Sequence, residues 1–282
     1  MKNVLVTGGA GFIGSHVVDA IVEAGHQATV LDRGVRPHRA DVAFVDVDLL
    51  NFPSLLDAAK GQDFMFHLAA TSNVNHVQRA PVFSTQQNVM GTCNVLDAAR
   101  LAGVGCVVLA STVWVGNAAT SNGDSRDEST PINVASAGHL HTSSKIDSEL
   151  IRHSYKELYG TSITVLRYGV PYGERMREEH LIPSFIKRAM AGQAIMLTGD
   201  GSQHRRFIYV KDLANAHVLA MSERAAGQTY NLEGTDKRAL SDPADRGCRI
   251  HLGIQILSAC RRPRNCCDMP NFDSRAGCAI SP

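Results

Sequence analysis

Short apolar runs alternate with longer amphipathic stretches through roughly the first 170 residues of the chain. The apolar runs have the length of strands and occur at residues 3–6, 27–31, 42–45, 63–68, 106–110 and 162–166. Stretches between them carry apolar positions at helical spacing, notably residues 14–24, 88–101 and 142–158. Strands that alternate with helices in this way are typical of a parallel sheet with helices on both faces.

The regular alternation of predicted strands and helices ends after Arg167. Gly and Pro are frequent at residues 169–173, and a helix at 181–191, a short strand at 207–210 and a helix from 212 to about 222 are expected to follow. We therefore predict an α/β protein with a Rossmann-type doubly wound parallel sheet at residues 1–166. A return segment near 205–222 is expected to rejoin it, and residues 167–234 form a smaller, incomplete C-terminal substrate domain.

The last part of the chain differs from the rest. Residues 235–282 hold seven arginines, four prolines and five cysteines, and the cysteine spacing matches no metal-binding pattern. We expect this tail to be atypical, either disordered or translated out of frame. Cys93 and Cys106 lie in apolar surroundings and are expected to be buried, reduced thiols.

The overall charge and hydropathy limit the kinds of partner that the protein is expected to bind. The formal net charge is +1, which favours neither nucleic acid nor an anionic membrane as the main partner. No stretch approaches the ~20 apolar residues of a membrane span. A soluble protein in the cytoplasm, with no metal site, is the default expectation.

A glycine-rich turn follows the first predicted strand directly. Gly8 permits a tight turn, Gly11 lets the backbone approach a pyrophosphate, and Gly14 allows the helix to pack close to the strand. The N–H groups of Phe12 and Ile13, at the helix start, would face the phosphates. The spacing therefore predicts a dinucleotide-binding site.

The next predicted strand ends in an acidic residue, which completes the sequence pattern of a dinucleotide-binding site. Asp32 is placed to accept hydrogen bonds from the adenosine ribose, and it would repel a 2′-phosphate. NAD is therefore favoured over NADP as the cofactor, although Arg33 beside it could counter that repulsion.

Further motifs resemble the extended short-chain dehydrogenase/reductase family, the NAD-dependent epimerases and dehydratases that act on nucleotide sugars. They are the Gly-x-x-Gly-x-x-Gly turn, Asp48-Leu49, His67-Leu68-Ala69-Ala70, Asn88-Val89-Met90-Gly91-Thr92, Arg167-Tyr168-Gly169, Arg205 within residues 201–207, and Tyr230-Asn231-Leu232. The resemblance covers about residues 1–234. It implies that Asp48 and Leu49 meet the adenine, that Leu68, Asn88 and Tyr168 line the cofactor, and that Arg205 grips the substrate diphosphate.

The resemblance also implies a catalytic set, and here the chain departs from the family. Lys145 resembles the family lysine, which lowers the pKa of a tyrosine four residues earlier, but that position holds His141. A histidine can act as a base near neutral pH, yet its ring reaches less far than a phenol. We hypothesise that His141 works through a water molecule or leaves the enzyme impaired; an ordinary polar helix residue is the alternative.

The loop after the strand at 106–110 bears on the reaction type. Aligned on Gly116, Ser111 takes the place of the family's supporting hydroxyl, and Thr112 is the fallback if the loop has lost a residue. Val113 and Trp114 occupy the positions of the dehydratases' Asp-Glu pair, so epimerisation or simple oxidoreduction fits better. Val170 replaces an asparagine that normally contacts the sugar nucleotide.

Two hypotheses remain open. The first is an NAD-dependent nucleotide-sugar epimerase of the UDP-glucose 4-epimerase type, which moves a hydride off a UDP- or dTDP-hexose and back. The second is a catalytically silent NAD-binding protein or decayed family member, which the His141 substitution and the tail favour. The resemblance also implies a homodimer formed through two helices of each subunit.

Overall fold

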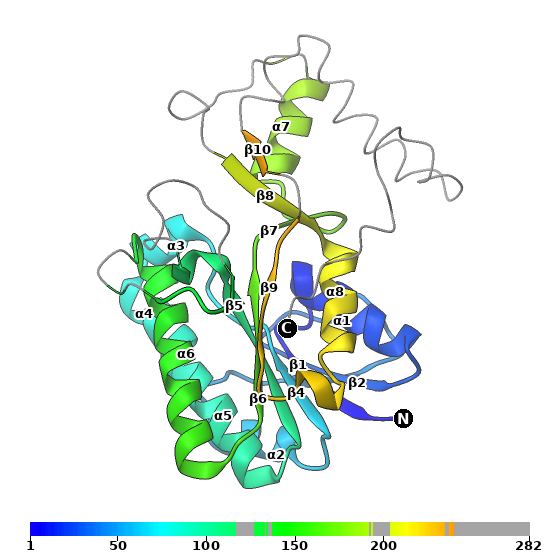
Figure 1. Cartoon of the computed structure of the whole chain (residues 1–282). Coiled ribbons are helices and arrows are strands. Elements are labelled where there is room, and N and C mark those ends of the chain that lie inside the picture. Colours follow the sequence, from blue (N-terminus) through cyan, green and yellow to red (C-terminus); the bar gives the residue numbers. More distant parts are fainter. Residues whose placement is uncertain are drawn as a thin grey trace.

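Seven parallel strands form the main sheet in the computed structural model, which describes residues 1–116, 127–132, 134, 137–191, 193, 204–234 and 237–239. The sheet order is β3-β2-β1-β4-β5-β6-β9 (Figure 1). The strands are β1 (Asn3–Thr7), β2 (Gln27–Asp32), β3 (Ala43–Asp46), β4 (Phe64–His67), β5 (Cys106–Thr112), β6 (Ile163–Tyr168) and β9 (Thr229–Leu232). The predicted Rossmann-type sheet is confirmed, and each of its first six strands lies where an apolar run predicts it.

Helices cover both faces of this sheet (Figure 1). Helices α1 (Phe12–Glu23) and α8 (Val210–Leu219) pack together on one face, while α2 (Phe52–Ala59), α5 (Gly91–Ala102) and α6 (Leu140–Tyr159) lie on the other. Alternate strand residues feed two separate cores: Val4 and Val6 of β1 belong to the core under α1, and Leu5 belongs to the opposite core. Apolar side chains on both faces explain why these strands are continuous hydrophobic runs.

The chain between β4 and α5 consists of short helical pieces. They are α3 (Val74–Arg79), α4 (Pro81–Thr85) and a π-helical turn, η1 (Gln86–Met90), which leads into α5 without a break. The predicted helix at 88–101 therefore begins inside this turn. Of the two cysteines expected to be buried, Cys106 is, but Cys93 is only half-buried because it lies on the partly exposed side of α5.

A second, smaller sheet lies beyond the carboxyl ends of the main strands (Figure 1). It has the order β10-β8-β7 and is built from β7 (Val170–Tyr172), β8 (His204–Tyr209) and β10 (Lys237–Ala239), with α7 (Leu181–Met190) nearby. After β8, the chain returns to the main sheet: α8 packs on α1, a 3-10 turn η4 (Glu223–Ala225) follows, and β9 pairs with β6. Residues 229–232, which the sequence suggests belong to the substrate region, thus pair within the main sheet.

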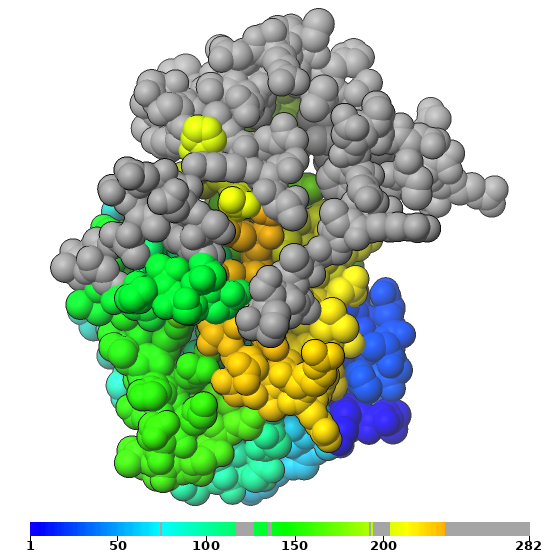
Figure 2. Space-filling view, viewed as in Figure 1, coloured from blue at the N-terminus to red at the C-terminus, as the bar shows by residue number. Residues whose placement is uncertain are grey.

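In Figure 2, α6 forms one side of the lower half, α8 and the segment that leads into β9 form the middle, and N-terminal residues in blue form the other side. Within the described residues, no helix has the length and apolar character needed to cross a lipid bilayer. The predicted tail falls almost wholly at residues 240–282, which lie outside the described residues.

Candidate active site

The glycine turn between β1 and α1 is shaped by close backbone contacts. Gly8 has φ +72°, and a Cβ there would lie 2.7 Å from the backbone nitrogen of Ala69. At Gly14 a Cβ would lie only 2.1 Å from the Gly8 carbonyl oxygen, so the helix can begin against the strand only if residue 14 is glycine. The contact with Ala69 also brings the backbone of Leu68, at the end of β4, beside the turn.

The start of α1 is open to an anion. Its N-cap is Gly11, which has no side chain to accept hydrogen bonds from the first turn. A Cβ at Gly11 would meet just one protein atom within 4 Å, the Gly8 carbonyl oxygen at 3.2 Å. The N–H groups of Phe12 and Ile13 and the positive end of the helix dipole are therefore left for a ligand, and a pyrophosphate fits them.

Asp32 lies at the end of β2, next to the turn. Its carboxylate accepts hydrogen bonds from the backbone nitrogens of Ala10 (3.1 Å) and Arg33 (2.9 Å). Burial raises the pKa of Asp32, and these two hydrogen bonds oppose that effect. The carboxylate is thus held in place with acceptor capacity to spare for ribose hydroxyls.

The guanidinium group of Arg33 is committed elsewhere. It pairs with the carboxylate of Asp48 at 2.6 Å and lies 5.3 Å from the centre of the Phe83 ring. This leaves Asp32 rather than an arginine to face the 2′-position, which answers the question the sequence left open and favours NAD. Asp48 also accepts hydrogen bonds from the Leu50 backbone and the Gln87 side chain, and Leu49 beside it is buried.

The fold and this turn together define a dinucleotide-binding Rossmann protein. A second group of residues then decides its chemistry, and it lies where β5 and α6 meet.

Lys145 is the central cation of this second group. Its Nζ is buried and donates a hydrogen bond to the Ala110 carbonyl oxygen of β5 at 2.9 Å. Burial lowers the pKa of Lys145 to about 8, while the negative charge of Glu149 acts in the opposite direction. The lysine therefore stays protonated at neutral pH, although its pKa lies only about one unit above that pH.

His141 lies one helical turn before Lys145, at the position of the family tyrosine. Burial lowers its pKa to about 4, and the charge of Lys145 adds to this effect. Its Nδ1 is buried and has no hydrogen-bond partner among the described residues. A neutral imidazole with an unused acceptor is thus fixed beside the cationic lysine.

An aromatic cluster lies next to His141. The ring of His139, which also caps α6 by accepting a hydrogen bond from the Thr142 backbone, is stacked 6.3 Å from His141 and lies 5.3 Å from Trp114. Trp114 belongs to a 3-10 turn, η2 (Val113–Gly116), and the guanidinium of Arg205 from β8 lies 6.0 Å above its ring. The structure therefore brings Arg205 to the same side of the site as His141.

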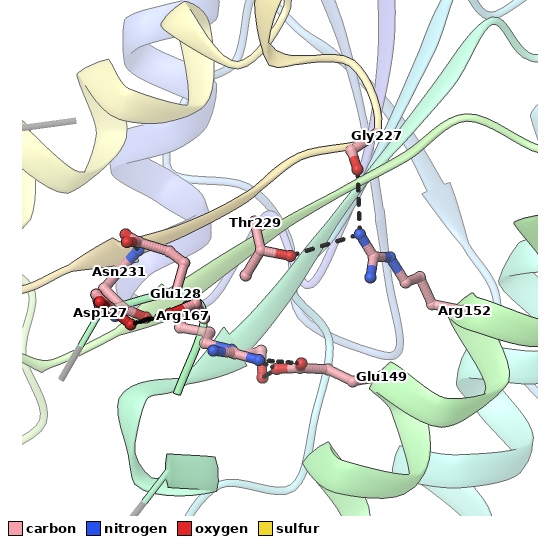
Figure 3. A network of polar contacts seen from close by, with 10 residues as sticks. Asp127, Glu128, Glu149, Arg152, Arg167, Gly227, Thr229 and Asn231 are labelled. Carbon is pink, nitrogen blue, oxygen red and sulfur yellow. Dashed lines mark hydrogen bonds and ion pairs between the residues drawn. The ribbon is translucent and has the colours of Figure 1, made fainter. Parts of the chain in front are cut away.

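Glu149 and Arg167 form a buried ion pair (Figure 3), and the hydroxyl of Ser111 bonds to it. The hydroxyl donates to Glu149 Oε1 at 2.5 Å, and both oxygens of Glu149 bind the guanidinium of Arg167, with distances of 3.0 and 2.7 Å. Thr112 is less constrained, because its bonds to the Tyr168 carbonyl and the Trp114 nitrogen are long, at 3.4 and 3.3 Å. Of the two hydroxyls that the sequence offers, Ser111 is buried and Thr112 is half-buried, so Thr112 is the more exposed to a ligand.

Sequence reasoning missed Glu149, although it follows Lys145 by four residues on the same helix face. A lysine and a glutamate at this spacing were the available signal. The nearby Arg152, one helical turn after Glu149, makes hydrogen bonds to the Gly227 carbonyl and the Thr229 hydroxyl, which anchors β9 (Figure 3). Glu128 also holds β9, by accepting a hydrogen bond from the Asn231 nitrogen at 2.7 Å.

Buried polar groups connect the two halves of the site. The side chain of Asn88 bonds the backbone of Thr71 in both directions and donates to the hydroxyl of Ser144 at 3.1 Å. Asn88 is therefore tied to α6 between His141 and Lys145. The hydroxyl of Tyr168 points away from the site, into the core under α8, where it contacts His217 Nε2 at 2.6 Å. Only its backbone and ring remain to meet a cofactor.

Comparison with known proteins agrees with this geometry. A family model described as the NAD dependent epimerase/dehydratase family matches residues 4–232. A putative UDP-glucose 4-epimerase of Methanocaldococcus jannaschii is 34% identical over 236 residues, which are 78% of this chain and 73% of that protein. A UDP-N-acetyl-alpha-D-glucosaminuronate decarboxylase of Bacillus cytotoxicus is 30% identical over 253 residues, 86% of this chain and 78% of the relative.

Solved structures show the same likeness. The UDP-glucose 4-epimerase of Thermotoga maritima with UDP-glucose has a TM-score of 0.80 at 25% identity, covering 91% of this chain and 82% of its own. The Thermus thermophilus UDP-glucose 4-epimerase in complex with NAD has a TM-score of 0.76 at 29% identity, covering 86% and 83%.

The chain belongs to the NAD-dependent epimerase/dehydratase family, as its sequence motifs predict. NAD is its cofactor. The parts of the protein that fit NAD are the uncapped N-terminus of α1, the open space beside Gly11 and the carboxylate of Asp32. No group of three or more metal-binding side chains occurs in the part of the chain that the structure describes.

Proposed function

We propose that this protein is an NAD-dependent epimerase of a UDP- or dTDP-hexose, with His141 in place of the usual tyrosine as the proton acceptor. The observation that carries the proposal is the pairing of buried, cationic Lys145 with neutral His141 one helical turn earlier. The proposed substrate region is the part of residues 167–234 that precedes α8, since α8 and β9 pack with the main sheet, and the expected location is the cytoplasm.

Each residue of the proposed site has a separate task. Bound NAD would take a hydride from the sugar and give it back. Lys145 would hold the nicotinamide ribose, the Nδ1 of His141 would accept the hydroxyl proton, and Thr112 rather than Ser111 would support that hydroxyl. Arg205, beside Trp114, would bind the diphosphate as a guanidinium fork.

Elimination of water fits the site poorly. That reaction needs a carboxylate near the sugar, and the positions that would supply one hold Val113 and Trp114. Glu149 is the buried acid closest in sequence to Lys145, but Arg167 and Ser111 occupy both of its oxygens. Epimerisation, which needs no such acid, is therefore preferred.

The low pKa of His141 favours a second candidate, a protein that binds NAD without turning over a sugar. A base with a pKa of about 4 is a poor acceptor for a hydroxyl proton, because its conjugate acid is too strong. Proton transfer at His141 would then limit the rate or stop the reaction.

A replacement at this position distinguishes the two candidates. His141→Tyr restores a longer acceptor beside Lys145, and we expect the turnover of UDP-glucose to rise by about 10²-fold, the lower range for general acid–base catalysis. The protein is purified, released NAD is quantified, and epimer formation is followed with UDP-glucose and UDP-galactose.

His153→Tyr serves as the control, because His153 is exposed on the same helix and away from the site. Bound NAD with no turnover in the wild type or in His141→Tyr would support the silent candidate. Absence of NAD from folded protein would contradict both.

We also propose a homodimer that pairs α5 and α6 with their symmetry copies. Large apolar side chains are exposed on these helices, including Leu101 of α5 and Leu150 and Leu158 of α6. Burying them against a second copy would remove this surface from water, and light scattering of the purified protein gives the mass that checks it.

A further inference from the structure

The carboxyl end of β5 is bound to α6 at two neighbouring residues. The ammonium group of Lys145 donates a hydrogen bond to the Ala110 carbonyl oxygen at 2.9 Å. The hydroxyl of Ser111, the next residue of the strand, donates to Glu149 Oε1 at 2.5 Å. Lys145 and Glu149 are four residues apart on α6, so they lie on one face of the helix. The end of the strand is therefore held by the glutamate as well as by the lysine.

Arg167 of β6 fixes the orientation of this glutamate (Figure 3). Its guanidinium binds both oxygens of Glu149, at 3.0 and 2.7 Å, and the two side chains are only 9% and 5% exposed. Arg167 is also the register partner of Ser111 on the neighbouring strand, so both side chains leave the sheet on the same face. A planar guanidinium that binds two oxygens allows the carboxylate few other orientations. Glu149 is therefore fixed in the interior by contacts from two adjacent strands.

Glu149 supplies the negative charge in the surroundings of Lys145. The two histidines on which the charge of the lysine acts, His67 of β4 and His141 of α6, are neutral at pH 7, because burial lowers their pKa values to about 3 and about 4. Arg167 is a cation. The negative charge of Glu149 raises the pKa of Lys145 against the effect of burial. A lysine buried without such a charge would lose its proton more readily.

We propose that Glu149 is a positioning residue, which keeps the ammonium group of Lys145 charged and in place for the nicotinamide ribose. The inference rests on the proposed function, in which the lysine holds that ribose. Arg167 and Ser111 fix the glutamate, and through Ser111 the glutamate fixes the strand end to which the lysine is bound. Glu149 itself touches neither cofactor nor substrate in this role, because both of its oxygens are already bound.

The pH dependence of NADH affinity tests the proposal without sugar substrate. In the wild type, fluorescence titration should give a Kd that is constant up to about pH 8 and rises above it, as Lys145 loses its proton. In Glu149→Gln the rise should begin about one pH unit lower, because the negative charge is gone. In Arg167→Gln, which keeps that charge, it should begin no lower than in the wild type.

The two single variants separate positioning from a purely structural role, because both break the same buried ion pair. If either fails to fold, Glu149→Gln/Arg167→Gln replaces both charges by amides, and its rise should also begin below that of the wild type. Ser111→Ala keeps every charge but frees the strand end, and it should raise the Kd about threefold without moving the pH at which the rise begins. Glu157→Gln, an exposed change on α6, is the control and should alter neither quantity.

Two results would overturn the proposal. The first is a rise that begins at the same pH, or is absent, in both the wild type and folded Glu149→Gln or the double variant. The second is an equal downward shift in both single variants, which would mean that the ion pair acts only by holding the fold together. A wild type that binds no NADH while its circular dichroism shows a folded protein would instead contradict the proposed function itself.

Discussion

Lys145, which is buried, and His141, which is half-buried, are two bases that influence each other across one turn of α6. Both lose affinity for protons because burial removes water from them, and the cationic lysine lowers the pKa of the histidine further. Between about pH 4 and pH 8 the pair therefore carries one positive charge, which is on the lysine, while the histidine is neutral. This is the charge state that a proton acceptor beside a cation requires.

The pH dependence of turnover follows from that state. Above about pH 8 Lys145 loses its proton, so kcat is expected to fall, approaching tenfold per pH unit. His141 stays neutral throughout this range and contributes no limb between pH 6 and 10. Stopped assays in a mixed buffer over that range measure the profile, with enzyme returned to pH 7 as a check for irreversible loss. A flat profile up to pH 10 would mean that the charge of Lys145 is not needed.

Helix α1 and the turn before it are the element on which cofactor binding depends. Two of its glycines are required for different reasons. At Gly14 the missing side chain makes room for the protein itself, whereas at Gly11 it makes room for a ligand. Gly11 has φ −75°, which any residue adopts without strain.

Alanine at each position should separate folding from binding. Gly11→Ala is expected to leave the free energy of unfolding within about 1 kcal/mol of wild type. It should weaken NAD binding at least tenfold, because the added methyl group occupies the space that the pyrophosphate needs. Gly14→Ala should lower stability by more than about 3 kcal/mol, since its Cβ overlaps the Gly8 oxygen. Urea denaturation and NADH titration of both variants measure the two effects. Equal loss of stability in both would contradict this division of roles.

Much of the first domain could be predicted from sequence, because its local signals agree with its long-range packing. Strands that are buried on both faces must be apolar throughout, and the glycine turn has few alternatives. Ser111 shows where this reasoning stops. Its spacing to Gly116 fits a supporting hydroxyl, but the residue that occupies that hydroxyl, Glu149, comes from a helix 38 positions later. Side-chain competition of this kind leaves no trace in the local pattern.

β9 is the other element that the sequence did not place in the sheet. It is four residues long, and its alternating burial resembles that of many short strands. What puts it beside β6 is a set of contacts from distant segments, including Arg152 to Thr229 and Glu128 to Asn231. Neither partner can be inferred from residues near β9.

Among the described residues, three histidines have a pKa so strongly lowered by burial that they stay neutral well into the acid range. Burial lowers the pKa of His67 to about 3 and those of His141 and His217 to about 4. Hydrogen bonds hold two of these rings: His67 lies between the hydroxyls of Thr7 and Thr92, and His217 lies between the Leu213 carbonyl and the Tyr168 hydroxyl. The Leu213 carbonyl can only accept, so His217 carries its proton on Nδ1.

The fold should therefore lose stability already at mildly acidic pH. The unfolded chain protonates these side chains below about pH 6.5, whereas the native state does not until near pH 4, so stability falls as the pH drops through that window. Each histidine contributes up to about 1.4 kcal/mol per pH unit, so the three together approach about 4 kcal/mol per unit near pH 5. Urea denaturation at pH 7, 6 and 5 measures the slope.

His217→Gln tests the assignment, because glutamine does not titrate. The slope near pH 5 should decrease by about a third, whatever the change in absolute stability. An unchanged slope would show that other groups are responsible.

The pairing of β9 with β6 also bears on how the chain folds as it is made. Until Leu232 has left the ribosome, the main sheet ends at β6, whose free N–H and C=O groups can pair with a neighbouring nascent chain. Sixty residues separate Tyr168 from that strand, which corresponds to several seconds of synthesis at ordinary rates. Aggregation during expression should therefore depend on how soon residues 229–232 emerge, and slow codons just before them would make it worse.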